Sequence, residues 1–405
     1  MSSSMNNKQQ KHLSERIKTV PESFIRRILK VSNQPDVISF AGGLPSADLF
    51  PVKALENACI KVLQTDGKQA LQYASTDGDA ELREWIANRY QRTQGFSVSP
   101  ENILITNGSQ QALDLLGKVL LNQADPVAIE NPGYLGAIQA FSLYRPSMHS
   151  IEINETGMDV SALQNTLKAH KPKLVYTVPN FQNPTGMSYS QQNREEVAQA
   201  IAQSDALLIQ DDPYGELRFS GEPKSNFMSL LPEQTLLLGS FSKIITPSFR
   251  LGWIVAPDWL IKPLTIAKQA ADLHTNYFSQ KVIMQYLNDN SVDEHIAKIR
   301  RFYGKQKQAM MNAIQGYFPD DVKIAESEGG MFLWATLPEN MSAMQLFDQA
   351  IAEKVAFVPG KPFYISNDEQ KDMPDNTLRL SYVTMDEARI RQGIEILGRC
   401  IKHLE

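Results

Sequence analysis

Ser240-Phe241-Ser242-Lys243 lies between two short apolar runs, at residues 235–239 and 251–255. Runs of this kind indicate strands, so the lysine is expected at the end of a sheet. Burial there disfavours the charged amine, and a neutral lysine can form a Schiff base with a carbonyl compound. Arg250 follows Lys243 by seven positions. It would place a guanidinium and the Ser240 hydroxyl beside the same group.

A hydroxyl paired with a guanidinium is the arrangement expected around a bound phosphate. Lysine, hydroxyl and arginine together therefore suggest pyridoxal phosphate. The alternative for an isolated Ser-x-x-Lys is a surface loop that carries an ordinary lysine. The rest of the chain has to decide between these two interpretations.

The bulk composition is that of an ordinary globular protein with more than one domain. The 405 residues allow two or three domains at about 150 residues each. Hydrophobic content of 42% and charged content of 21% are typical values. The formal net charge of -5 gives no basic surplus that would favour nucleic acid or an anionic membrane as a partner.

Cysteine usage favours a reducing compartment. Cys59 and Cys400 have no C-x-x-C spacing, so we expect neither a disulfide framework nor a metal site. Residues 1–11 are polar and lack the apolar core of a secretory signal. No apolar stretch reaches the roughly 18 residues of a membrane span. A cytoplasmic location without membrane attachment is expected.

Strand-like and helical segments alternate before about residue 260. The strand-like segments are residues 102–106, 127–130, 173–178, 206–210, 235–239 and 251–255. This alternation indicates an α/β fold with a mostly parallel, doubly covered sheet. Polar residues and glycines collect after each strand, where open α/β sheets bind ligands.

The alternation weakens in the C-terminal part, which suggests a smaller α+β domain. The elements expected there are a long helical region to about residue 317, strands at 332–335 and 378–383, and a helix at 386–404. We therefore expect residues 46–285 to form a large cofactor-binding domain and residues 286–405 a small domain. Residues 1–45 would form an N-terminal arm that joins the small domain.

A second phosphate-binding candidate is Asn107-Gly108-Ser109-Gln110-Gln111, which follows the strand at residues 102–106. A strand, a glycine turn and a helix N-terminus form an anion site, because free backbone N–H groups and the helix dipole point at it. Simple N-capping of the helix by Ser109 is the alternative.

Pyridoxal phosphate also needs a carboxylate at its pyridine nitrogen. Asp211 ends a buried strand, where a carboxylate is costly unless it faces a cation such as a protonated pyridine. Asp212 would point to the other side of the strand, so Asp211 is preferred. The alternative is a pair of turn aspartates before Pro213.

Other polar and aromatic residues could complete the cofactor site. Asn183, in an Asn-Pro-Thr-Gly sequence, and Tyr214 could donate to the ring oxygen, and Tyr134 could stack on the ring face. Taken singly, each is more often a turn residue or a core aromatic. Gly43, in the pair Gly42-Gly43, permits close backbone approach to a ligand or simply makes a turn.

Arg379 alternates with apolar neighbours on an expected strand, so we expect it to be half-buried and to bind a carboxylate through its two terminal nitrogens. The carboxylate is either the α-carboxylate of a substrate or a structural aspartate or glutamate. The aromatic residues Tyr73, Tyr134, Phe363 and Tyr364 hint at tolerance for apolar or aromatic substrates.

These motifs occur in the order found in the class I/II aminotransferases, which are fold-type I pyridoxal phosphate enzymes, and residues 20–400 resemble that family. Arg250 follows Lys243 by one residue fewer than in the aspartate aminotransferase pattern. This shorter loop between Lys243 and Arg250, together with the sequences of residues 40–45 and 71–73, resembles the branch of α-aminoadipate, kynurenine and broad-specificity aminotransferases. That branch often has a mobile N-terminal segment that closes over the substrate, here around residues 17–29.

The resemblance implies a role for each matching residue. Lys243 would be the Schiff-base and proton-transfer residue, with Asp211 at the pyridine nitrogen and Tyr134 on the ring face. Asn183 and Tyr214 would serve the ring oxygen. Substrate would be bound by Arg379, with Gly43 and Asn183. The implied phosphate ligands are Ser109, Gln110, Ser240, Arg250 and, from the neighbouring subunit of a homodimer, Tyr73.

The implied reaction is transfer of an amino group from an L-amino acid to a 2-oxo acid such as 2-oxoglutarate, with ping-pong kinetics. Donors would be apolar, aromatic or aminoadipate-like amino acids. Two alternatives stay open: a pyridoxal phosphate β-lyase on the same fold, and a ligand-sensing module that binds the cofactor without turnover. Bacterial regulators fuse the same domain to a DNA-binding module, but no basic helix-turn-helix region precedes it in this sequence.

Overall fold

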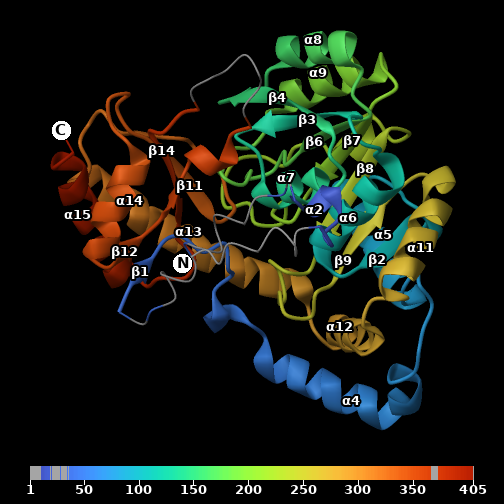
Figure 1. Cartoon of the computed structure of the whole chain (residues 1–405). Helices are drawn as coiled ribbons and strands as arrows, with labels where there is room; N and C mark the ends of the chain where they lie inside the picture. The colour runs from blue at the N-terminus through green and yellow to red at the C-terminus, as the bar shows by residue number, and fades with distance from the viewer. Residues whose placement is uncertain are drawn as a thin grey trace.

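A large mixed sheet forms the centre of the molecule (Figure 1). The computed structural model describes residues 11–18, 20, 28, 34, 36–365 and 373–404. The strand order is β2-β9-β8-β7-β6-β3-β4-β5. The bounds are β2 Ile103–Thr106, β3 Pro126–Asn131, β4 Ser147–Asn154, β5 Gly157–Met158, β6 Leu174–Thr177, β7 Leu207–Asp211, β8 Thr235–Ser240 and β9 Gly252–Val255.

The expected α/β fold with a mostly parallel sheet is confirmed. Strands β8, β7, β6, β3 and β4 run parallel to one another. Strand β9 runs antiparallel to both β2 and β8, and β5 is antiparallel to β4, so the edges are mixed. Because the central strands are parallel, their carboxyl ends meet at one edge of the sheet.

Both faces of this sheet are covered, as the apolar strands require. Ile129, Tyr176 and Ile209 belong to one core cluster. Their sequence neighbours, such as Val175 and Leu208, belong to a second cluster on the opposite face. The helices of this body are α5 Ala80–Gln94, α6 Gly108–Leu120, α7 Leu135–Ser142, α8 Val160–His170, α9 Gln191–Ala202, α10 Phe227–Leu230 and α11 Asp258–Asp272.

A second body contains most of the C-terminal part. Its sheet has the order β10-β11-β14-β13, with all neighbours antiparallel. Helices lie beside this sheet (Figure 1). The bounds are α13 Val292–Tyr317, β10 Lys323–Ile324, β11 Phe332–Thr336, α14 Ala343–Ala352, β12 Val355–Ala356, β13 Val358–Pro359, β14 Thr377–Ser381 and α15 Glu387–Lys402.

The N-terminal part of the chain reaches this second body. Strand β1 (Ile38–Ser39) pairs in parallel with β12. Of the segment around residues 17–29, expected to close over a substrate, only residues 17, 18, 20 and 28 are described; Lys18 ends α2 (Glu15–Lys18). The rest of that segment lies outside the described residues. Within the described part of the chain, no helix combines the length and apolar character needed to cross a membrane.

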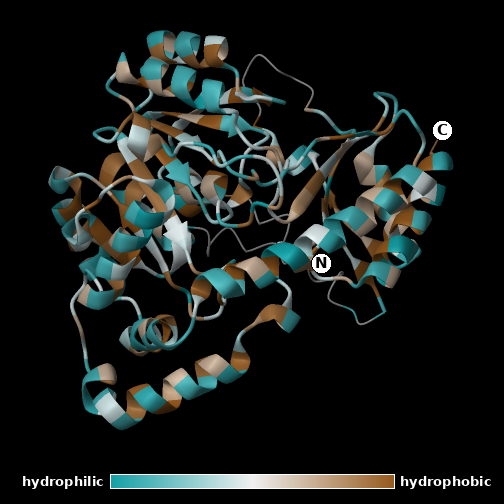
Figure 2. Ribbon diagram, turned by 180° about the vertical axis from the view of Figure 1, so that it is seen from behind, coloured by the Kyte–Doolittle hydropathy of each residue, from teal (hydrophilic) through white to brown (hydrophobic). Residues whose placement is uncertain are grey.

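Helix α4 (Val52–Ala70) lies apart from the large sheet and packs against α12 (Tyr277–Asp289) (Figure 1). Figure 2 shows hydrophobic residues along this helix although it lies at the edge of the molecule. Several large hydrophobic side chains of this helix and of the turn after it are exposed. They are Val52, Ile60, Leu63, Leu71 and Tyr73.

Candidate active site

A cavity of about 410 Å³ opens where the central strands end, a size typical of small-molecule sites. Its lining contains every site residue expected from the sequence except Tyr73. The lining residues are Gly43, Leu44, Ser109, Gln110, Tyr134, Val178, Asn183, Asp211, Pro213, Tyr214, Ser240, Ser242, Lys243, Pro247, Arg250 and Arg379. The structure thus brings together segments that are more than 300 residues apart in the sequence.

Lys243 lies three residues after the end of β8, and its amine reaches the N-terminal segment. Its Nζ donates a hydrogen bond to the Gly43 carbonyl oxygen at 2.7 Å. Burial, helped by the positive charges of Arg379 and Arg250, lowers the pKa of the amine from its ordinary 10.5 to about 8. The expected environment for a reactive lysine is therefore present, and the surface-loop alternative is wrong.

Asp211 is the last residue of β7 and is almost completely buried. The Tyr176 hydroxyl donates to its Oδ2 at 2.8 Å, while its Oδ1 has no hydrogen-bond partner among the described residues. Burial, with smaller repulsion from Asp212 and Glu130, raises the pKa of Asp211 to about 7. An unpaired carboxylate oxygen of this kind favours a cationic group opposite it.

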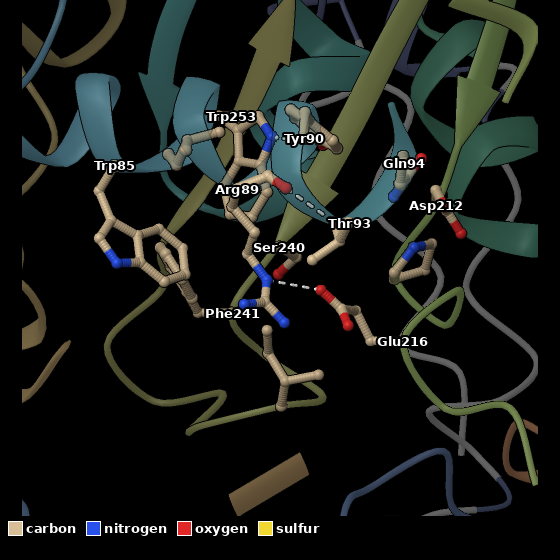
Figure 3. Close-up of a pocket in the computed structure, with 13 residues that line it drawn as sticks. Trp85, Arg89, Tyr90, Thr93, Gln94, Asp212, Glu216, Ser240, Phe241 and Trp253 are labelled. Atoms are coloured by element: carbon tan, nitrogen blue, oxygen red, sulfur yellow. Dashed lines mark hydrogen bonds and ion pairs between the residues drawn. The ribbon is translucent and has the colours of Figure 1, made fainter. Parts of the chain in front are cut away.

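Asp212 faces away from this cavity, as strand alternation predicts. It lines a second, smaller cavity, together with Trp85, Phe241 and Glu216 (Figure 3). Asp212 Oδ1 accepts hydrogen bonds from Gly215 N of its own loop and from Asn180 Nδ2 in the segment after β6. Asp212 therefore orders the loop that carries Tyr214. Of the two aspartates, only Asp212 is a turn residue, whereas Asp211 lines the cavity.

The end of the same loop is held by an ion pair. Glu216 Oε1 lies 2.7 Å from Arg89 Nε, and Figure 3 shows the two side chains meeting beside the second cavity. Arg300 Nε donates to the Glu216 carbonyl oxygen at 2.6 Å. Tyr214 thus lies between two fixed points of the loop, Asp212 and Glu216.

Arg379, on β14, is more deeply buried than the expected half-buried residue, with 2% of its surface exposed. Its Nη1 donates to Asn183 Oδ1 and its Nη2 to the Ala41 carbonyl oxygen, both at 2.7 Å. Its Nε has no partner in the described part of the chain. Its hydrogen-bond partners among the described residues are Asn183 and Ala41 rather than an aspartate or glutamate, so the structural-acid alternative is not supported.

Asn183 and Tyr214 approach each other in the cavity. Asn183 Nδ2 lies 3.5 Å from the Tyr214 hydroxyl oxygen. Burial raises the pKa of the Tyr214 hydroxyl well above its ordinary value, so it stays protonated and can donate a hydrogen bond. Phe332 packs edge-on against the Tyr214 ring, and the centroid of its ring lies 4.3 Å from the Arg379 guanidinium carbon.

The N-terminus of α6 and the loop after β8 form one end of the cavity. Asn107 is the N-cap of α6, so Ser109 and Gln110 are its second and third residues, and the N-capping alternative for Ser109 is wrong. Arg250 Nη2 donates to the Asn107 carbonyl oxygen at 3.3 Å. Ser240 Oγ accepts a hydrogen bond from Ser242 N at 3.0 Å. Free helix N–H groups, hydroxyls and a guanidinium together suit an anion.

The remaining aromatic candidates are placed differently from one another. Tyr134 lines the cavity, and burial raises its pKa to about 12. Tyr73 is 77% exposed, outside the cavity, with its ring edge-on to His274. Phe363 is fully buried beside Arg379, and neither it nor Tyr364 lines the cavity. The hint of substrate tolerance therefore rests on Tyr134 alone.

Two residues that support the site were not identified from the sequence. Tyr176 binds Asp211 directly. Glu130 is fully buried and accepts hydrogen bonds from Thr177, Val178, Gln182 and Tyr189, which orders the loop before Asn183. Tyr176 and Glu130 lie inside apolar strands, and a buried polar side chain needs a hydrogen-bond partner. Their positions in these strands could therefore have identified them from the sequence.

The donor set fits pyridoxal phosphate. A partly neutral amine suits its aldehyde, and a buried carboxylate with one free oxygen suits its pyridine nitrogen. The helix N-terminus with its hydroxyls and Arg250 suits its phosphate. Each functional part of the cofactor thus has a chemically matched group on the wall of one cavity.

Known proteins are similar to this chain over nearly its whole length. The family model "Aminotransferase class I and II" matches residues 35–397. Aromatic-amino-acid aminotransferase 1 of Thermococcus litoralis is 41% identical over 403 residues, 97% of this chain and 94% of that protein. Kynurenine aminotransferase of Pyrococcus horikoshii, solved in complex with PMP, is 38% identical with a TM-score of 0.92, covering 98% of each chain.

The α-aminoadipate aminotransferase of Thermus thermophilus, solved with N-(5'-phosphopyridoxyl)-L-leucine, is 38% identical with a TM-score of 0.90 and covers 98% of each chain. These matches confirm the expected fold-type I architecture and establish pyridoxal phosphate as the cofactor. The chain belongs to the class I and II aminotransferases, which use this cofactor to move an amino group between amino acids and 2-oxo acids.

Proposed function

We propose that Lys243, Asp211 and Arg379 are the central residues of this aminotransferase. Lys243 would hold the cofactor through its amine, Asp211 would face the pyridine nitrogen, and Arg379 would bind the substrate α-carboxylate. Asn183 and Tyr214 would serve the ring oxygen. Tyr134 would cover the ring face, Gly43 and Asn183 would contact the substrate, and Ser109, Gln110, Ser240 and Arg250 would bind the phosphate.

Bound pyridoxal phosphate supplies a carbon that exchanges amino groups and a ring that accepts the electron pair released at the substrate Cα. Lys243 Nζ is the proposed carrier of the Cα proton, because its pKa of about 8 lets the amine lose and regain a proton near neutral pH. Asp211 would stay ionised opposite a cationic ring nitrogen. Its unpartnered Oδ1 is the single observation that supports this role most strongly.

The position of Arg379 supports an α-carboxylate as its partner. The guanidinium is buried and fixed by Asn183 and the Ala41 carbonyl oxygen, neither of which neutralises its charge. Burial lowers the pKa of Arg379 to about 10, so it stays protonated at neutral pH. A substrate carboxylate would supply the missing negative charge and hold the amino acid in one orientation.

We expect a broad range of amino donors with apolar, aromatic or aminoadipate-like side chains, and an acceptor that is a 2-oxo acid such as 2-oxoglutarate. The cations of the described lining, Lys243, Arg250 and Arg379, all have proposed roles. Leu44, Tyr134 and Val178 leave the other walls largely apolar. These walls suit an apolar or aromatic donor side chain.

The test is kcat/KM for phenylalanine, leucine and 2-aminoadipate as donors, each with 2-oxoglutarate as acceptor. The proposal expects amino transfer from all three donors, and their kcat/KM values show which side chain the cavity prefers. Transfer from only one of the three would contradict a broad donor range. No amino transfer with any of the three would contradict the proposed donor class.

The exposed apolar side chains of α4 and the following turn support a homodimer. Exposed hydrophobic residues that gather on one element mark an interaction surface. Tyr73, which projects from this region, is proposed to reach the phosphate of the neighbouring subunit. Sedimentation velocity is expected to show a dimer for the wild type, with Leu63→Glu shifting it towards monomer. A monomeric wild type would contradict the proposal.

Three further expectations stay proposals. The separate sheets support a division into a large domain at 46–285 and a small one at 286–405, with 1–45 as an arm. The two free cysteines, Cys59 and Cys400, support a reducing cytoplasm. A lid around residues 17–29 remains a prediction from the family resemblance.

A further inference from the structure

Lys268 is a fully buried lysine that the proposed chemistry does not use. It lies on α11, and its side chain is 0% exposed. Burial lowers its pKa, while Asp272, one turn further along the helix, opposes this effect. Lys268 Nζ donates to Asp272 Oδ1 and Oδ2 at 2.9 and 2.8 Å. A buried ion pair of this kind is weak evidence for stability and needs another explanation.

The ion pair is connected to the first turn of α6. Lys268 Nζ also donates to Gln111 Oε1 at 3.0 Å. Gln111 Nε2 and Asn107 Nδ2 both donate to Asp272 Oδ2, at 2.7 and 2.5 Å. The Asn107 backbone N–H donates to Gln111 Oε1 at 2.8 Å. Lys268 and Asp272 thus bind the first turn of α6 through hydrogen bonds to Asn107, its N-cap, and to Gln111, its fourth residue.

Asn107 in turn fixes two parts of the proposed phosphate site. It immediately precedes Gly108 and Ser109, whose N–H groups begin the helix. Its carbonyl oxygen accepts the hydrogen bond from Arg250 Nη2. Gly108 has a φ of 72°, and a Cβ atom there would lie 2.4 Å from Arg250 Nη2. The helix start and the guanidinium are therefore packed too closely for one to move without the other.

We propose that Lys268, with Asp272 and Gln111, is a positioning residue for the cofactor phosphate: it fixes Asn107, and through Asn107 the α6 N-terminus and Arg250. The proposal rests on the proposed phosphate ligands. The three residues contact Asn107 or each other rather than the cavity, since none of them lines it. Their loss is expected to weaken the binding of a phosphate-bearing ligand and to spare the ring and aldehyde contacts.

The test compares pyridoxal phosphate with pyridoxal, which has the same ring and aldehyde but no phosphate. Dissociation constants of both are measured by equilibrium dialysis on cofactor-free wild type and Lys268→Met. The variant is expected to bind pyridoxal phosphate about tenfold more weakly, the size of a lost anion contact at a partly buried helix N-terminus. Pyridoxal binding is expected to change less than about twofold. Lys262→Met, at an exposed position on the same helix, is the matched control and should change neither constant.

Equal weakening of both ligands would overturn the proposal, because it would indicate a general structural role. Unchanged binding of pyridoxal phosphate would overturn it as well. If Lys268→Met does not fold, Gln111→Leu removes the same connection to Asn107 and must show the same selectivity for the proposal to stand. A wild type that binds pyridoxal as tightly as pyridoxal phosphate would instead contradict the phosphate ligands themselves.

Discussion

Replacing Arg379 with alanine removes the group proposed to bind the substrate α-carboxylate. The guanidinium is held by two short hydrogen bonds and is almost completely buried, so it is oriented before the substrate arrives. The variant leaves Asn183 Oδ1 and the Ala41 carbonyl oxygen without their donors, and leaves a bound carboxylate without a counter-charge.

The size of the effect follows from the burial of the pair. Truncating one partner of a buried, hydrogen-bonded charge pair costs about 2–5 kcal/mol. At about 1.4 kcal/mol for each factor of ten, kcat/KM for an amino acid should fall roughly 30- to 4000-fold. Most of the loss should appear as a higher KM, because the carboxylate contact exists in the bound substrate as well as during the reaction.

The assay is steady-state transamination of phenylalanine, combined with the dissociation constant of pyridoxal phosphate for the cofactor-free variant. The dissociation constant of the cofactor should rise far less than KM, because Arg379 has no proposed contact with the phosphate or with Lys243. Phenethylamine, which has the same side chain but no carboxylate, provides the substrate control. The wild type should prefer phenylalanine strongly, and Arg379→Ala should lose most of this preference. An unchanged KM for phenylalanine, or a preserved preference over phenethylamine, would refute the reasoning and make Arg379 a structural residue.

Three other predictions concern the cofactor contacts. Lys243→Ala should keep the far-ultraviolet circular dichroism of the wild type and show no transamination; wild-type turnover in this variant would defeat the assignment. The rate at which cofactor-free wild type takes up pyridoxal phosphate should rise with pH through about 8, since the Lys243 amine becomes neutral above its lowered pKa; a rise only near 10.5 would indicate an ordinary lysine. Asp211→Asn should lower kcat roughly 100- to 1000-fold, the usual effect of removing one aligned electrostatic group, and a kcat within a few-fold of wild type would exclude the pyridine contact.

The sequence was most informative where chemistry and strand ends coincide. Lys243, Asp211 and Asn183 each follow or end an apolar strand, and parallel strands bring such residues to one edge. The preference for Asp211 over Asp212 needed only the alternation of side chains along a strand. The sequence at residues 107–111 predicted an anion site because a glycine turn and a helix N-terminus follow a strand there.

The rest depended on contacts between distant segments. Strand β4 was missed because it pairs near the edge of the sheet and is largely not buried, so it has no continuous apolar run. The reversed direction of β9 follows from its short connection to β8 after the lysine loop, which residue patterns do not encode. Asn183, a partner of Arg379, and Gln111, a partner of Lys268, each lie more than 150 residues away in the sequence. No spacing rule reveals them.

The most direct test of the account is a half-reaction with purified protein that carries pyridoxal phosphate. The protein is mixed with single amino acids, namely phenylalanine and one that carries a leaving group on its β-carbon, without any 2-oxo acid acceptor. The visible absorbance of the bound cofactor and the released products are followed. With phenylalanine, the account predicts loss of that absorbance with one equivalent of 2-oxo acid per Lys243 site and no ammonia. Persistent absorbance with ammonia accumulating from the β-substituted amino acid would show a lyase, and no change with either amino acid would show a binding module without turnover; either result would contradict the account.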